Sequence, residues 1–324
     1  MQSLAPQTIR SVSRHGVLLA LVALIVFGWL RYDNFLGSFN ILTVLRYNAM
    51  FALVALGMAY VIMTGGIDLS VGSTAALGSV VAALLSPYGV LPGLLGGVAA
   101  GLAVGAVNAL VITRMNILPF IATLATMLAA SGCALLLADN QSVSVSYETG
   151  FVELGQGDFL GFPIPAWIAG AAFLIGSIAL NLTAWGRTVL AIGGNEDATR
   201  MMGLAADRVK ASVYLLSGGL AGLAGVILAA QFGAGQPIEG VGWELFAIAA
   251  VVVGGTLLTG GVGSVGATLA GVLLLGLIFN ILNFENGLGW ISLSAYWQSV
   301  IRGAFLLLVV VIQARLVART EAAA

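Results

Sequence analysis

A series of long apolar runs, joined by short polar connections, is the feature that most constrains the fold of this chain. A helix that crosses a bilayer needs about 20 apolar residues, and the chain divides into about ten such runs. The runs are continuous rather than alternately apolar and polar, which favours helices over the strands of a membrane barrel. Their approximate spans are 16–30, 44–63, 70–86, 92–113, 117–138, 164–183, 212–231, 245–259, 262–282 and 297–314.

Composition supports the same interpretation. Only 8% of the residues are charged and 60% are hydrophobic, whereas soluble domains carry about 25% charged residues. Such a chain cannot cover a water-facing surface. The 44 glycines fit a membrane protein, because small residues let membrane helices approach closely. We therefore predict an all-α, polytopic integral membrane protein with about ten transmembrane helices.

The distribution of charge predicts the orientation. The loop 139–163 carries acids but no Lys or Arg, whereas the loop 184–211 carries Arg187, Arg200, Arg208 and Lys210. The positive-inside rule then makes 139–163 periplasmic and places 184–211, the N-terminal segment 1–15 and the tail 315–324 in the cytoplasm, with 16–314 as the transmembrane domain. Arg31 and Arg46 fall on the outer side as exceptions.

Several classes of chemistry are excluded. The single cysteine, Cys133, cannot form an internal disulfide, and with His15 as the sole histidine there is no Cys/His cluster for a metal. Basic residues are too few and scattered for nucleic acid. No G-x-x-x-x-G-K-[ST] phosphate loop is present, and the one lysine, Lys210, follows no such pattern. We predict neither an enzyme nor a metal or cofactor site.

The stretch TGGIDLSVGS (64–73) interrupts an apolar tract with an acid, Asp68, that has no Lys or Arg within about twenty residues. An acid at membrane depth is costly unless it is paired or hydrated. Two readings stay open: Asp68 caps the following helix, or it lines a pathway. The pattern partly repeats at 259–266, which predicts structural roles for the glycines Gly65, Gly66, Gly72, Gly260 and Gly261.

The loop 184–211 contains the signals of one short helix. Asn195 is a favourable N-cap, Glu196 and Asp197 follow in the first turn, and Gly203 is placed to end the helix at C′. A helix of about two turns is unstable alone in water, so another element must hold it. It is either part of a solvated connecting loop or a docking helix that presents its methionines to a partner.

Four segments resemble the permease subunit of bacterial ATP-binding cassette importers for monosaccharides of the ribose, galactose and xylose type. They are TGGIDLSVGS (64–73), NILPFIATLATM (116–127), GRTVLAIGGNEDATRMMGL (186–204) and ELFAIAAVVVGGTLLTGGVGSVGATLAG (244–271), and the resemblance extends from about residue 44 to 314. The segment 284–303 is most similar to the galactofuranose-type branch. One departure is Phe246, where relatives commonly have an acid, although Glu244 lies two residues earlier.

The resemblance implies a division of labour. Two permeases, identical copies or sister chains, form the pore in the bacterial inner membrane, a cytoplasmic ATPase that uses ATP and Mg²⁺ drives it, and a periplasmic binding protein delivers the sugar. The coupling helix would contact the ATPase through Asn195, Glu196, Asp197, Arg200, Met201, Met202 and Gly203.

Polar residues within the spans are candidates for the translocation path: Asp68, Ser70, Ser73, Asn108, Asn116, Thr123, Gln231 and Asn280, with Thr74, Thr126 and Asn283 beside them. For the serines and threonines, bonds between helices are the commoner role. Arg302, inside the last run, is expected to extend to the interface. Alternatives to the sugar importer are a permease for branched amino acids or nucleosides, an ion-coupled secondary transporter and a non-transporting scaffold.

Overall fold

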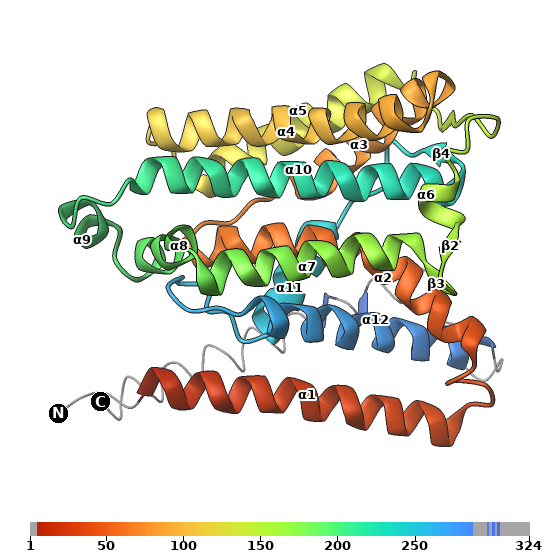
Figure 1. Cartoon of the computed structure of the whole chain (residues 1–324), viewed down its shortest axis with the longest axis horizontal. Helices are drawn as coiled ribbons and strands as arrows, with labels where there is room; N and C mark the ends of the chain where they lie inside the picture. The colour runs from red at the N-terminus through yellow and green to blue at the C-terminus, as the bar shows by residue number, and fades with distance from the viewer. Residues whose placement is uncertain (1–4, 288–296, 298–299, 302, 305–324) are drawn as a thin grey trace.

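The computed structural model describes residues 5–287 together with 297, 300, 301, 303 and 304, and the side chains from residue 16 onward. It is a helical bundle, and Figure 1 shows its long helices lying roughly parallel. The long helices are α1 (Ala5–Arg31), α2 (Ser38–Met63), α3 (Val71–Leu85), α4 (Val90–Arg114), α5 (Pro119–Leu137), α7 (Ile164–Leu182), α10 (Ala206–Phe232) and α12 (Val265–Gly287).

Shorter elements connect them. They are the 3₁₀ turn η1 (Ser86–Tyr88), β1 (Val143–Ser144), α6 (Glu153–Gln156), β2 (Asp158–Phe159), β3 (Phe162–Pro163), α8 (Ala184–Gly194), α9 (Glu196–Met201), β4 (Ala234–Gly235) and α11 (Trp243–Val253). β1 pairs antiparallel with β4, and β2 with β3. Figure 1 places these strands at the end of the bundle opposite α8, α9 and the start of α1.

In the described part of the chain, seven helices are long and apolar enough to cross a membrane. The two remaining expected spans that fall on described residues are matched by shorter apolar helices, Gly16–Arg31 and Trp243–Val253. Of the run 297–314 only residues 297, 300, 301, 303 and 304 are described, and Arg302 and the tail 315–324 lie outside the described residues. A multi-helix integral membrane protein is therefore confirmed, in its coarser form.

One predicted boundary is wrong. The run 245–259 was expected to be one helix, but α11 ends at Val253 after 11 residues. Gly255, with φ +85°, donates its N–H to the Val252 carbonyl, and Thr256 donates to the Val251 carbonyl. These two bonds form the glycine-terminated motif that commonly ends helices. The stretch that follows, up to α12, is loop although its sequence is mostly apolar and glycine.

α10 occupies the middle of the bundle, where it packs against α4, α3 and α2. Its contact with α4 is unusually close, because glycines from both helices face one another: a Cβ at Gly105 would lie 2.6 Å from the Tyr214 carbonyl oxygen, and one at Gly222 would lie 2.6 Å from that of Gly97. Such glycines let the two backbones pack directly together. The element that carries the loop 184–211 into the membrane is therefore at the centre of the core.

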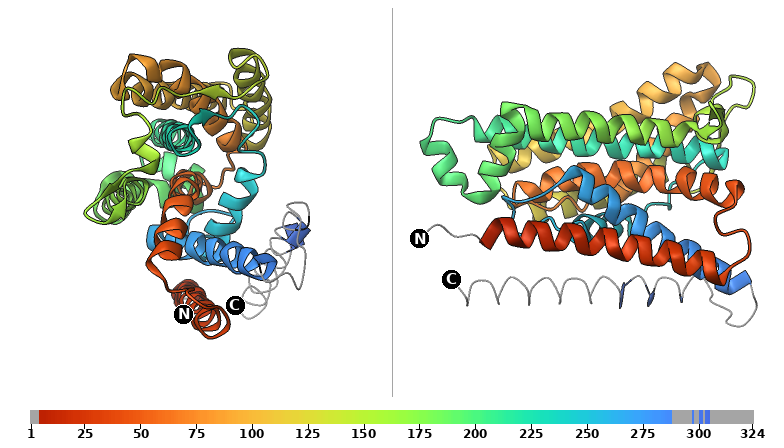
Figure 2. Two further views of the ribbon diagram at one scale, coloured as in Figure 1. Left: turned by 90° about the vertical axis from the view of Figure 1, so that its right-hand side faces the viewer. Right: turned by 60° about the horizontal axis from the view of Figure 1, so that its bottom comes forward.

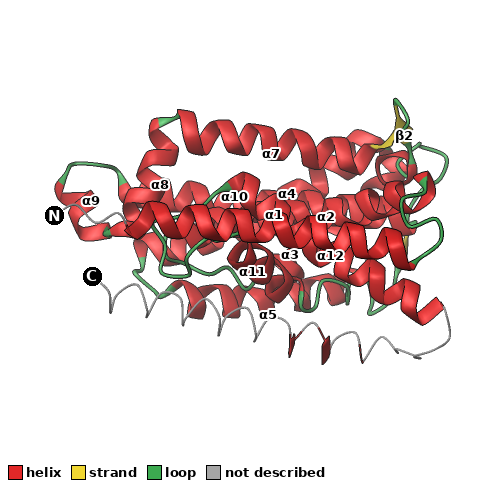
Figure 3. Ribbon diagram, turned by 90° about the horizontal axis from the view of Figure 1, so that it is seen from below, coloured by secondary structure: helices red, strands yellow, loops and turns green. Residues whose placement is uncertain are grey.

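Figure 2 shows α1 at one edge of the bundle beside α12, with α4 and α5 at the opposite edge. The view from below in Figure 3 places α7 and α5 on opposite sides of the central helices. At the end of α1, Tyr32 donates a hydrogen bond to Glu285 at 2.7 Å, and Arg31 lies 3.5 Å from the same carboxylate. Arg46 pairs with Asp158 at 2.6 Å. Both arginines that break the predicted charge rule therefore have acidic partners.

Candidate functional site

The loop 184–211 folds into two helices, α8 and α9, which are joined at Asn195 before α10 begins. The Asn195 side chain accepts a hydrogen bond from the Ala198 N–H at 2.8 Å, as an N-cap does. At the other end Gly203, with φ +78°, donates to the Arg200 carbonyl, and Leu204 donates to that of Thr199. Both predicted ends of the short helix are confirmed.

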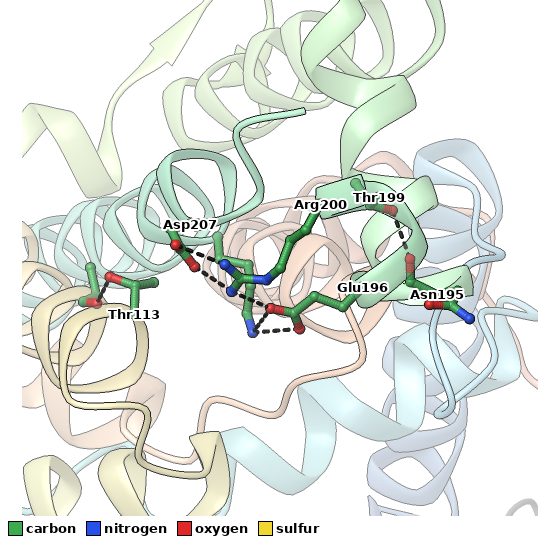
Figure 4. Close-up of polar contacts among 8 residues, drawn as sticks. Thr113, Asn195, Glu196, Thr199, Arg200 and Asp207 are labelled. Atoms are coloured by element: carbon green, nitrogen blue, oxygen red, sulfur yellow. Dashed lines mark hydrogen bonds and ion pairs between the residues drawn. The ribbon is translucent and has the colours of Figure 1, made fainter. Parts of the chain in front are cut away.

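Ion pairs fasten α9 to the start of α10 (Figure 4). Arg200 contacts Glu196 at 2.8 Å and Asp207 at 2.5 Å, while Lys210 contacts Glu196 at 2.8 Å. Burial opposes ionisation of Glu196, but the hydrogen bonds from Lys210 and Arg200 outweigh it and lower the pKa of that carboxyl. Glu196 thus stays charged throughout the neutral range. These contacts supply the support that so short a helix needs.

Two methionines at the C-terminal end of α9 are exposed. Met201 is 89% exposed and Met202 66% exposed, and Leu204 beside them is also exposed. Thr199 is the buried residue of α9, and its hydroxyl donates to the Asn195 carbonyl. Flexible, polarisable methionines suit a surface that fits into another protein. α9 is therefore a tip at one end of the bundle that exposes two methionines and is held on α10 by ion pairs.

Three pairs of glycines meet just behind this tip. Gly193, near the end of α8, packs so closely on Met63 and Gly261 that a Cβ there would overlap the Met63 carbonyl oxygen and the Gly261 nitrogen. A Cβ at Gly260 would lie 2.7 Å from the Gly65 nitrogen. Gly261 donates its N–H to the Met63 carbonyl at 3.0 Å. The loop therefore contacts both copies of the Thr-Gly-Gly pattern, at a point that we call the glycine junction.

Asp68 lies deep in the protein, 1% exposed, between α2 and α3. One carboxylate oxygen accepts the N–H of Ser70 at 3.0 Å and its hydroxyl at 2.6 Å, and the other accepts the Ser217 hydroxyl of α10 at 2.8 Å. Ser70 is the residue before α3, so Asp68 closes the turn ahead of the helix instead of capping its first turn. Hydrogen bonds to hydroxyls and backbone therefore stand in for a basic partner.

The same network extends to α4 and α5. Asn108 donates to the Ser70 hydroxyl at 2.9 Å, and Thr126 donates to the Asn108 amide oxygen at 2.6 Å. Thr123 donates to the Ile67 carbonyl at 3.2 Å. Asp68, Ser70, Asn108 and Thr123 are thus brought together, but as links between helices with little access to solvent.

Other candidates for the path lie apart from this network. Asn116 is exposed in the turn between α4 and α5, where its φ of +54° fits an asparagine. Gln231 lies near the end of α10, and its buried side-chain amide has no hydrogen-bond partner among the described residues. Ser73 is half-buried on α3. Asn280 lines a cavity between α2, α11 and α12, and pairs its amide with that of Asn40.

No group of three or more His, Cys, Asp or Glu side chains comes together as a metal site in the part of the chain that the structure describes.

Comparisons with known proteins agree with this architecture. A family profile described as the permease component of a branched-chain amino acid transport system matches residues 40–310. The chain belongs to this permease family. It is 41% identical to the ribose import permease of Bacillus subtilis over 92% of this chain and 91% of that protein. The corresponding values for the ribose import permease of Escherichia coli K12 are 40%, 91% and 92%.

A further relative is the L-arabinose permease of Azospirillum brasilense, 36% identical over 92% of this chain and 87% of its own length. No solved structure matches the permease.

Several residues of the permease carry contacts that the sequence did not single out. Ser217 and Tyr214 of α10 face the turn around Asp68; a Cβ at Gly66 would collide with the Tyr214 hydroxyl. Gly193 holds the glycine junction, and its only signal in the sequence was the Gly-Gly pair before Asn195.

Phe246, the departure from the family pattern, packs on Phe51 with ring centroids 4.6 Å apart. Glu244 points elsewhere, since a Cβ at Gly72 would lie 3.0 Å from its carboxylate.

Proposed function

We propose that the permease forms the membrane pathway of an ATP-binding cassette importer for a monosaccharide. The observation that carries the proposal is α9, an exposed pair of methionines on a helix that is capped at both ends and fixed by Arg200 and Lys210. A membrane protein has little reason to hold an apolar tip rigidly in water unless a partner covers it. The ribose and arabinose permeases that match over nine-tenths of the chain support a sugar as the cargo.

The mechanism we infer is alternating access, driven from outside the chain. A cytoplasmic ATPase subunit holds α9 in a cleft and supplies ATP and Mg²⁺ chemistry, with no cofactor bound by the permease. Its closure displaces α9 as a unit, because the ion pairs with Asp207 and Lys210 tie α9 to α10. The same displacement reaches α2 and the loop before α12 through the glycine junction.

The wider assembly is also part of the proposal. The chain lies in the bacterial inner membrane with about ten crossings, both termini and residues 184–211 facing the cytoplasm, and residues 139–163 facing a periplasmic sugar-binding protein. A second permease, a copy or a sister chain, completes the pore. Specificity for one sugar, including a galactofuranose-type substrate, rests mainly with the binding protein.

The first experiment targets α9 with Met201→Asp and Gly203→Pro. Met201→Asp puts a charge into the ATPase contact, and proline cannot adopt the positive φ that position 203 requires. We expect both variants to insert in the membrane normally, to lose co-purification of the ATPase and to lose sugar uptake.

Leu160→Asp is the matched control, because Leu160 is also apolar and 74% exposed but lies between β2 and β3, at the opposite end of the bundle. It should keep the ATPase. Sugar uptake at normal levels by either α9 variant would overturn the proposal.

A second experiment separates the importer from an ion-coupled transporter. Uptake into vesicles should continue when an uncoupler collapses the ion gradient, provided ATP is maintained. Uptake that stops under those conditions would favour the ion-coupled alternative. Competition by leucine or a nucleoside, with none by sugars, would instead favour the neighbouring classes of cargo, to one of which the family description refers.

A further inference from the structure

A cavity of about 680 Å³ lies between α2, α11 and α12. It is lined by the first half of α2, the loop that leads into α11, and the second half of α12, so it belongs to the half of the bundle away from α9. Its volume falls within the range of roughly 300–1,000 Å³ that is typical of small-molecule sites. It does not include Asp68 or the network around it.

One wall of the cavity is aromatic. Phe51 lies at the centre, with its ring centroid 4.7 Å from that of Trp243 and 4.6 Å from that of Phe246, and Phe246 lies 5.9 Å from Phe279. These rings come from three different helices. Flat apolar walls of this kind, combined with a few placed polar groups, are the usual composition of ligand sites.

The polar groups come from α2 and α12. Asn48 is buried, and its amide donates to the Val44 carbonyl at 2.8 Å. It fits only because residue 276 is glycine, since a Cβ there would collide with the Asn48 amide. Asn280 is fixed by its paired bonds to Asn40, at 3.1 and 2.8 Å. The amides are therefore held in place beside the rings.

We infer that this cavity holds the monosaccharide during its passage, with Trp243 and Phe246 against the C–H face of the ring and the amides of Asn48 and Asn280 near its hydroxyls. This inference rests on the proposed function and assigns the site within it. Among the described lining residues Glu239 is the only charged one, so an amino acid carboxylate would meet no described cation there. The buried amide of Asn48 and the half-buried amide of Asn280 also make the cavity a poor match for a lipid chain.

The cavity is connected through the chain to α9, the helix proposed to contact the ATPase. α11 forms part of its wall, and the loop after α11 runs to the glycine junction, where Gly260 and Gly261 contact the α8–α9 segment. α11, the helix between the cavity wall and this loop, is only 11 residues long. A displacement at α9 therefore changes the wall that carries Trp243 and Phe246.

Thiol labelling tests the assignment, since Cys133 is the one native thiol. In a Cys133→Ser background, Phe246→Cys and Phe279→Cys are introduced singly into the complete importer, in right-side-out membrane vesicles. A membrane-impermeant methanethiosulfonate is added with or without D-ribose, L-arabinose or leucine.

The matched control is Leu128→Cys, on the exposed surface of α5 away from the cavity. Because a thiol reacts as its hydrated thiolate, we expect both cavity cysteines to react about tenfold faster than the control. Ribose or arabinose should slow that labelling, and leucine should leave it unchanged.

The inference fails if the cavity cysteines react no faster than the control, or if leucine protects them and the sugars do not. ATP-dependent uptake is measured on the same vesicles. Intact sugar uptake with unreactive cavity cysteines would contradict only the assignment of the sugar site. Absence of ATP-dependent sugar uptake by the Cys133→Ser parent would contradict the proposed function.

A second variant asks whether the ring at position 243 discriminates between sugars. Trp243→Leu should change the ratio of ribose to arabinose uptake while the ATPase and permease still co-purify. Trp167→Leu, an exposed tryptophan near β2 and β3, should leave that ratio unchanged. An equal fall for both sugars in Trp243→Leu would mean a purely structural role and would overturn the assignment of Trp243.

Discussion

The two Thr-Gly-Gly copies, at 64–66 and 259–261, have nearly the same sequence and are used differently. The first ends α2: Gly65, with φ +80°, donates to the Ile62 carbonyl, and Gly66 donates to the Val61 carbonyl. The second lies in the loop that follows α11, which has already ended at Val253. The serines that follow also differ. Ser70 binds Asp68, whereas Ser264 faces the Ala267 N–H at 3.4 Å, at the start of α12.

The difference shows which part of the pattern is shared. Both copies place a glycine of positive φ at the glycine junction, where Gly260 lies against both Gly65 and Gly193. Only the first copy has an acid, and that acid belongs to a hydrogen-bond network that reaches α4, α5 and α10. The glycines thus contact the loop 184–211, and Asp68 stabilises the packing of one side of the bundle.

The largest effect on sugar uptake should come from a change at the glycine junction, which both copies share. Gly193→Ala forces a methyl group against the Met63 carbonyl and Gly261, and overpacking of this kind costs about 1–3 kcal/mol where the backbone cannot move away. We expect sugar uptake to be lost, with the ATPase still bound through α9. Uptake and ATPase co-purification measure the two outcomes.

Gly194→Ala is the control, since a Cβ there meets nothing within 4 Å. Equal uptake by the two variants would break the comparison, because it would mean that the junction is not in tight contact.

A smaller effect is expected from changes at Asp68, which only the first copy has. Asp68→Leu removes the acceptor for two buried hydroxyls, those of Ser70 and Ser217, at about 1–3 kcal/mol for each group left unpaired. Asp68→Asn keeps one oxygen acceptor, and its amide can donate to a serine. We expect Asp68→Leu to lower the melting temperature of the purified complex and Asp68→Asn to keep transport. Lost transport in a stable Asp68→Asn complex would assign a role to the charge itself.

The smallest effects should separate the two serines. Ser264→Ala removes a long N-cap contact, and loss of an N-cap costs about 0.5–2 kcal/mol, here at the lower end. Ser70→Ala breaks the bonds with both Asp68 and Asn108, so it should lower the melting temperature more. A larger shift for Ser264→Ala would contradict the different roles assigned to the two turns.

Local signals carried much of the prediction. Continuous apolar runs placed the long helices, and Asn195 and Gly203 placed both ends of α9, because caps act within a few residues of where they are read. The apolar run after Val253 led to a wrong helix boundary, because hydropathy alone does not show that a helix ends. The bond from Ser217 to Asp68 and the contact of Gly193 with Met63 join distant segments. Local sequence patterns do not predict such contacts. They also do not predict the close packing of Asn48 against Gly276.

The packing of α1 has a consequence for how the protein is made. Its described contacts are with α12 and the end of α11: Val17 joins Ala270 and Leu274, and Tyr32 reaches Glu285. Synthesis proceeds from the N-terminus, so α1 enters the bilayer long before these partners exist. α1 is stable in the bilayer without these partners, because a helix forms all its backbone hydrogen bonds within itself. α1 is therefore made well before its packing partners, and this edge of the bundle can assemble only after α12 has been synthesised.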